Sequence, residues 1–163
     1  VLEHGESTTP DAQARLSGFL KACARKGICV RDEDVQVWSY DAHEMEAWWA
    51  SKPRQTAIFA WNEGVAGNIL KQAARLGIEV PRQLSVVGFD STAYCETTTP
   101  KLTAVRQPIS AMANAAAEYL FRLLEGEETQ TEDLVFACSL DERESLSVSP
   151  KLVGETLAVE EKT

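Results

Sequence analysis

The stretch that decides the fold is residues 56–108, TAIFAWNEGVAGNILKQAARLGIEVPRQLSVVGFDSTAYCETTTPKLTAVRQP. An apolar run at 56–61 ends at the polar residue Asn62, and a helical pattern follows. After a break between Gly77 and Pro81, a second apolar run at 85–89 ends at Asp90. Two strands that each deliver a polar group at their carboxyl end are how an open α/β sheet builds a small-molecule site.

The alternation of predicted strands and helices continues on both sides of this stretch. We expect helices at about 11–27, 41–51, 64–76 and 108–124, and strands at 34–40, 56–61, 85–89, 102–106 and 135–140. Asp11 is a candidate cap for the first helix, and residues 1–10 and 91–100 read as loops. Because nearly continuous apolar strands alternate with helices, the predicted fold class is α/β, a Rossmann-like parallel sheet flanked by helices.

Composition and charge exclude several classes of function. The chain has 163 residues and a net charge of −9, whereas direct contact with nucleic-acid phosphates needs a face rich in Lys and Arg. No apolar run approaches the roughly 20 residues of a membrane span. The four cysteines form no C-x-x-C pair and read as reduced, buried thiols. We therefore expect a cytoplasmic location, no membrane, no metal and no cofactor.

Asn62 and Asp90 are the strongest candidates for binding a ligand. The amide of Asn62 offers two donors and an acceptor, which suits a hydroxyl-rich or heterocyclic ligand. It could equally cap the helix that follows. The carboxylate of Asp90 can accept hydrogen bonds from neighbouring ligand hydroxyls, or it could cap a turn. The residues alone leave both alternatives open.

Other candidates carry less information by themselves. Arg15, on the first turn of a helix, would ordinarily be a solvated surface residue. Trp38, Tyr40 and Trp61 lie at or near predicted strand ends, where core packing is the usual role of an aromatic residue. No G-x-S-x-G, P-loop, H-E-x-x-H or G-x-G-x-x-G pattern occurs, so we do not expect an enzyme.

Several spaced motifs resemble the effector-binding domain of LacI/GalR-type transcription regulators. The segments that carry the resemblance, in the family's order, are residues 15–19, 56–63, 76–81, 84–90, 100–108 and 142–145. Together they cover about residues 11–150. One departure is Glu63, which stands where the family usually has Asp, so its role is open.

The resemblance implies the fold of type I periplasmic sugar-binding proteins, with two Rossmann-like lobes and a ligand cleft between them. It implies that Arg15, Asn62 and Asp90 bind the effector and that Tyr40 stacks on it. Trp38 and Trp61 would add aromatic surface suited to a sugar face or a flat ring. The predicted ligand-binding set is therefore Arg15, Trp38, Tyr40, Trp61, Asn62 and Asp90.

The resemblance also divides the chain. Residues 1–106 would form the carboxyl-terminal lobe, and residues 107–133 a crossover and a helix that normally lie in the other lobe. Residues 134–150 would return to the first lobe, and residues 151–163 would form a flexible tail. We expect the helix at 108–124 to pack on a second copy or to leave an exposed apolar patch, so a homodimer is predicted.

The predicted function is effector sensing for a DNA-binding regulator. The small molecule would be a sugar or sugar derivative. Operator DNA would be bound only by a separate helix-turn-helix domain, which this chain lacks. The alternative is a transport-type periplasmic sugar-binding protein of the same fold. A full-length gene with a signal peptide upstream would favour transport, and one with a basic helix-turn-helix would favour regulation.

Overall fold

A computed structural model of the chain describes residues 2–3, 9–38, 42–53, 55–127 and 133–148. Its main sheet has the strand order β3 (Ala57–Phe59), β4 (Ser85–Asp90), β5 (Thr103–Arg106) and β6 (Ser139–Asp141). The first three strands are parallel, and β6 runs antiparallel to β5. A parallel pair forms beside it from β1 (Leu2–Glu3) and β2 (Val37–Trp38). The predicted α/β class is confirmed.

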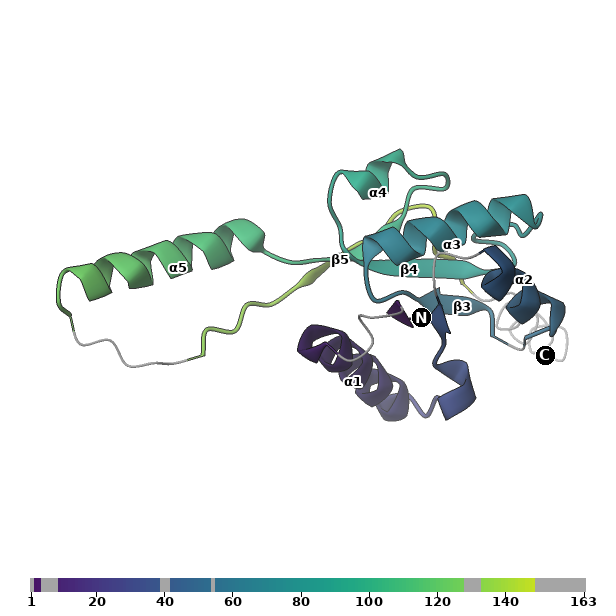
Figure 1. Cartoon of the computed structure of the whole chain (residues 1–163), viewed down its shortest axis with the longest axis horizontal. Helices are drawn as coiled ribbons and strands as arrows, with labels where there is room; N and C mark the ends of the chain where they lie inside the picture. The colour runs from purple at the N-terminus through teal and green to yellow at the C-terminus, as the bar shows by residue number, and fades with distance from the viewer. Residues whose placement is uncertain (1, 4–8, 39–41, 54, 128–132, 149–163) are drawn as a thin grey trace, which may run out of the picture.

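Helices lie on both sides of the sheet. α3 (Glu63–Arg75) runs along β4 on one side, and α1 (Pro10–Arg25) lies on the other (Figure 1). α2 (Ala42–Ala50) contacts α3, and the short α4 (Tyr94–Thr97) packs near its amino end. α3 forms where predicted because its apolar residues recur on one face, and it ends where Gly77 adopts a left-handed φ of 69°.

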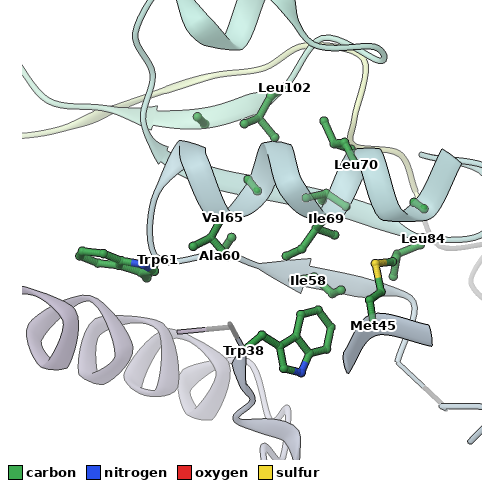
Figure 2. Packing of buried hydrophobic residues seen from close by; sticks show 14 of the residues in the cluster. Trp38, Met45, Ile58, Ala60, Trp61, Val65, Ile69, Leu70, Leu84 and Leu102 are labelled. Atoms are coloured by element: carbon green, nitrogen blue, oxygen red, sulfur yellow. The ribbon is translucent and has the colours of Figure 1, made fainter. Parts of the chain in front are cut away.

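The hydrophobic core lies between α3, the sheet and α2. Val65 and Ile69 of α3 approach Ile58 of β3, and Met45 of α2 and Trp38 of β2 come from other elements to the same region (Figure 2). Each such side chain contributes about 1.5–3 kcal/mol of free energy when it is fully buried. This core fixes β3 and β4 relative to each other, and so fixes the positions of their carboxyl ends.

The structure corrects several predicted boundaries. Residues 2–3 pair with β2 and residues 94–97 are helical, although loops were expected in both regions. Thr9, rather than Asp11, takes the cap position of α1. A strand was expected at 34–40. Asp32–Asp34 instead forms a 3₁₀ turn, and the strand that the structure describes is Val37–Trp38.

The final strand also begins later than predicted. It starts at Ser139 rather than at Val135, because its partner β5 ends at Arg106, which pairs with Ser139. Val135 lies beyond the end of that partner strand and is 92% exposed. The apolar sequence of 135–138 therefore predicted a strand that has no neighbour to pair with.

α5 (Ile109–Leu124) stands apart from the rest of the molecule (Figure 1). It contains no buried residue, and Ile109, Phe121 and Leu124 are 60%, 62% and 74% exposed. We use the name arm for residues 107–127 and 133–138, which lead from β5 into α5 and back to β6. Among the described helices, none combines the length and apolarity needed to cross a membrane.

Candidate functional site

The carboxyl ends of β3 and β4 bring Asn62 and Asp90 to one edge of the sheet, because the two strands are parallel neighbours. Asn62 caps α3: its Oδ1 accepts a hydrogen bond from the backbone N–H of Val65 at 2.8 Å. The side-chain amide nitrogen of Asn62 makes no hydrogen bond to another described residue. Capping therefore uses the oxygen of Asn62 and leaves its donors available to a ligand.

Asp90 receives donors from two distant parts of the chain. Its Oδ1 accepts from Nε2 of Gln107 at 2.7 Å and from Nη2 of Arg15 at 3.5 Å. Asp90 and Ser91 both have a positive φ, of 92° and 45°, which is uncommon for residues other than glycine. Such backbone strain is typical of functional sites, where surrounding contacts hold it in place. We call residues 90–92 the corner.

Arg15 reaches this corner from α1 and is held on several sides. Its Nη1 donates to the carbonyl oxygen of Trp61 at 2.7 Å, and its guanidinium carbon lies 4.2 Å from the centre of the Phe89 ring. The Arg15 side chain is only 15% exposed. The general expectation of a solvated surface arginine is therefore wrong here, since the guanidinium is stacked, hydrogen-bonded and paired with Asp90.

The aromatic candidates have different surroundings. Trp61 is buried beside Arg15, and its buried Nε1 has no hydrogen-bond partner among the described residues. Trp38 packs in the core, edge to face with Trp48 at 5.8 Å between ring centres. The structure thus brings Trp61 to the group around Asp90 and does not bring Trp38 there. Tyr40 lies outside the described residues.

A network of ions and hydroxyls holds Ser91 from the far side of the corner. Its hydroxyl donates to Asp141 at 2.6 Å and accepts from Arg143 at 3.2 Å. The guanidinium of Arg106 also binds Asp141 and, with the Ser91 hydroxyl, holds the pKa of that carboxyl below its ordinary value. The hydroxyl of Ser91 is fully used within the protein, so the side chain next to Asp90 is structural.

Glu63 holds the third residue of the corner. Its carboxylate accepts from the backbone N–H of Thr92 at 2.8 Å and from the Thr92 hydroxyl at 2.6 Å. The buried thiol of Cys95 donates to the same carboxylate at 3.2 Å. Burial, followed by the hydrogen bond to Glu63, raises the pKa of Cys95 to about 12. Cys95 is therefore a neutral thiol near pH 7 and not a nucleophile.

Sequence reasoning missed Gln107. It follows β5, the third parallel strand, so its position at a strand's carboxyl end is the same signal that singled out Asn62 and Asp90. The group Arg15, Asp90 and Gln107 offers paired donors and acceptors and contains no hydroxyl, thiol or amine. Among the described residues, no cluster of His, Cys, Asp and Glu could hold a metal ion.

Comparison with known proteins shows which family this chain belongs to. Residues 1–146 match the model of the periplasmic binding protein-like domain. The chain belongs to this family. It is similar to the HTH-type transcriptional repressor PurR of Erwinia tasmaniensis, with 29% identity over 140 residues, or 83% of this chain and 41% of the relative. The family assignment agrees with the resemblance to LacI/GalR-type effector-binding domains.

Solved structures of the family show the same fold. The Escherichia coli transcriptional repressor ascG superposes with a TM-score of 0.77 at 27% identity, covering 91% of this chain and 55% of that one. The transcriptional regulator CelR in complex with cellobiose gives 0.74 at 28% identity, covering 82% and 42%. These relatives are transcription regulators, not enzymes. The chain spans about two fifths of the length of the curated relative, 41%.

Proposed function

We propose that the chain is the ligand-sensing part of a DNA-binding transcription regulator and that it binds a sugar or sugar derivative. The observation that carries the proposal is the convergence of Arg15, Asp90 and Gln107 at the carboxyl ends of parallel strands, with Asn62 on the adjoining end. Each side chain can donate to or accept from ligand hydroxyls.

The charge at the site supports a neutral ligand. Arg15 is paired with Asp90 at 3.5 Å and with Asp11 at 3.8 Å, so its positive charge is already balanced within the protein. At this described wall of the site, a phosphate or carboxylate ligand would meet a guanidinium that is already paired and would approach two carboxylates. A polyol has both donors and acceptors and no charge. The cellobiose bound by CelR is a ligand of this class.

In this proposal the described residues form one wall of an interlobe cleft. Residues 107–133 carry the chain into the second lobe, and residues 134–150 return it. The regulator is cytoplasmic and dimeric, and it binds operator DNA through a separate helix-turn-helix domain. Effector binding shifts the population of closed and open lobes through its different affinity for each. A transport-type periplasmic binding protein remains the competing function, and the full-length gene separates the two.

The test uses the full-length regulator. A thermal-shift screen of neutral sugars, sugar phosphates and purine bases should show stabilisation by a neutral sugar. For that sugar, Asp90→Ala should weaken binding by about 1–3 kcal/mol in calorimetry, because a ligand hydroxyl loses its acceptor. Glu79→Ala, on an exposed loop, is the matched control. Stabilisation only by purines or phosphates, or unchanged affinity in Asp90→Ala, would overturn the proposal.

A further inference from the structure

Glu63 connects the two strand ends that carry Asn62 and Asp90. It is the first residue of α3 and directly follows Asn62 at the end of β3. Its carboxylate reaches across to Thr92, two residues after Asp90, and takes both the backbone N–H and the hydroxyl of that residue. A single side chain therefore spans the gap between the ends of β3 and β4.

The corner that Glu63 holds needs such support. Asp90 and Ser91 both have left-handed backbone conformations, which persist only where neighbouring contacts determine them. Asp90 is held by its side chain, through Arg15 and Gln107, and Ser91 through Asp141 and Arg143. Within the corner, Glu63 supplies the hydrogen-bond acceptor for a backbone N–H, that of Thr92.

Close packing of α3 against β4 and α4 explains why the contact is so well defined. The backbone of Glu63 lies beside Gly88, where an added Cβ would be 3.4 Å from the Glu63 Cα. On the other side, the thiol of Cys95 from α4 donates to the Glu63 carboxylate. An acid in the first turn of a helix would by itself only complement the helix dipole. The three donors on Glu63 give it a more specific role.

We propose that Glu63 is a positioning residue of the ligand site, which sets the geometry of Asp90 relative to Asn62 before a ligand arrives. This inference rests on the proposed function, because it assumes that the edge formed by these two residues binds a small molecule. Both carboxylate oxygens of Glu63 take part, one accepting from the Thr92 backbone N–H and the other from the Thr92 hydroxyl.

The test reads the geometry of Asp90 without a ligand. In the 163-residue chain, the side-chain amide of Gln107 donates to Asp90, so its exchange with water, measured by NMR, reports whether the carboxylate is in place. In Glu63→Ala we expect the Gln107 side-chain amide and the Thr92 backbone N–H to exchange about tenfold faster, because the corner opens locally. Glu63→Gln should be intermediate, because its amide oxygen still accepts from Thr92.

Two comparisons make the result specific. Glu79→Ala removes a carboxylate from an exposed ion pair far from the corner, and it should leave both exchange rates unchanged. Core amides such as that of Ile69 should also keep their rates in Glu63→Ala, which distinguishes local opening from general destabilisation. If Glu63→Ala does not fold, Glu63→Gln supplies the same comparison.

The proposal fails if the Gln107 and Thr92 rates in a folded Glu63 variant equal those of the unsubstituted chain, or if they rise only together with the core amides. Neither outcome depends on a ligand. A screen in which no sugar stabilises the regulator would overturn the proposed function and leave these rates as they are. Unchanged rates alongside a sugar that does bind would overturn the role of Glu63 alone.

Discussion

At the scale of single residues, Arg15 shows how surroundings change the role of a side chain. Its guanidinium lies over the Phe89 ring while its Nη1 donates to a backbone carbonyl. A planar, forked donor can make both contacts at once, whereas the ammonium of lysine offers no flat face for stacking. Arg15 therefore joins α1 to the ends of β3 and β4 through contacts that a lysine would not reproduce.

Replacing Arg15 should lower stability. In Arg15→Ala, the carbonyl of Trp61 and the carboxylate of Asp90 both lose a charged donor, so the free energy of unfolding should fall by about 1.5–3 kcal/mol. Urea denaturation monitored by tryptophan fluorescence measures this change. The exposed Arg25, in the last turn of α1, is the matched control, and Arg25→Ala should change stability little. Equal stability of the two variants would contradict the role given to Arg15.

Asp141 should make the corner sensitive to acid. Its folded-state pKa lies below the ordinary value of 3.8, chiefly because of Arg106, so its ion pairs add stability above that pH. This contribution is lost as the pH falls through the folded-state pKa. Between pH 5 and 2, Asp141→Asn should therefore show a shallower loss of melting temperature than the unsubstituted chain. Parallel curves for the two proteins would show that Asp141 is not linked to acid unfolding.

The sequence identified some of these residues and missed others for physical reasons. Asn62 and Asp90 follow apolar runs, so the end of the run marks them. Arg15 was placed only by resemblance, because a helix pattern does not show which distant ring an arginine will cover. Gln107 also follows a strand, but its hydrogen bond to Asp90, 17 residues away, joins two strand ends that only the folded sheet brings together.

At the scale of elements, α4 packs on α3 at Gly67, a residue that has no side chain. A Cβ added at Gly67 would lie 2.1 Å from the hydroxyl oxygen of Tyr94. The Tyr94 ring of α4 therefore packs directly on the backbone of α3. No periodic pattern predicts a four-residue helix, which explains why residues 91–100 read as a loop. The contact with Gly67 is a tertiary feature and leaves no local trace in the sequence.

Gly67→Ala should reveal this packing in a double-mutant cycle. Alanine is favoured over glycine inside a helix by about 1 kcal/mol, so Gly67→Ala should stabilise a Tyr94→Ala background by about that amount. In the presence of Tyr94 the ring must move, and the gain should shrink or reverse. Thermal or urea unfolding of the four proteins gives the coupling energy. Identical effects of Gly67→Ala in both backgrounds would mean that the ring moves without penalty.

The strands show what a sequence can predict about elements. β4 was predicted within one residue because its apolar run coincides with pairing on both edges. β6 was predicted too early, because Val135 has the right residue type but lies beyond the end of β5. Strand length depends on the neighbouring strand as well as on composition, and only the composition is visible in the sequence.

At the scale of the whole molecule, α5 should control self-association. Between Ile109 and Leu124 only Glu118 and Arg122 are charged, so two copies of this helix would repel each other little. The exposed side chains of Leu120, Phe121 and Leu124 form an apolar surface, which favours association in water.

Sedimentation velocity of the 163-residue chain should show a concentration-dependent increase in mass. The doubly substituted variant Leu120→Glu, Phe121→Glu should remain monomeric, because it places charges on the exposed apolar surface. Ile28→Glu, at an exposed apolar residue beyond α1, is the matched control and should associate like the unsubstituted chain. A monomer at all concentrations, or equal association of the three proteins, would contradict a role for α5.

The antiparallel pairing of β5 and β6 also bears on how this domain could be re-engineered. Arg106 and Ser139 pair opposite each other at the ends of the two strands. Beyond β5 the chain leaves the rest of the molecule toward α5 (Figure 1). A two-residue turn such as Asn-Gly closes antiparallel neighbours of this kind. In topological terms the arm is thus an insertion into a β-hairpin. A different segment could therefore replace the arm between β5 and β6, and the order of the strands in the main sheet would stay the same.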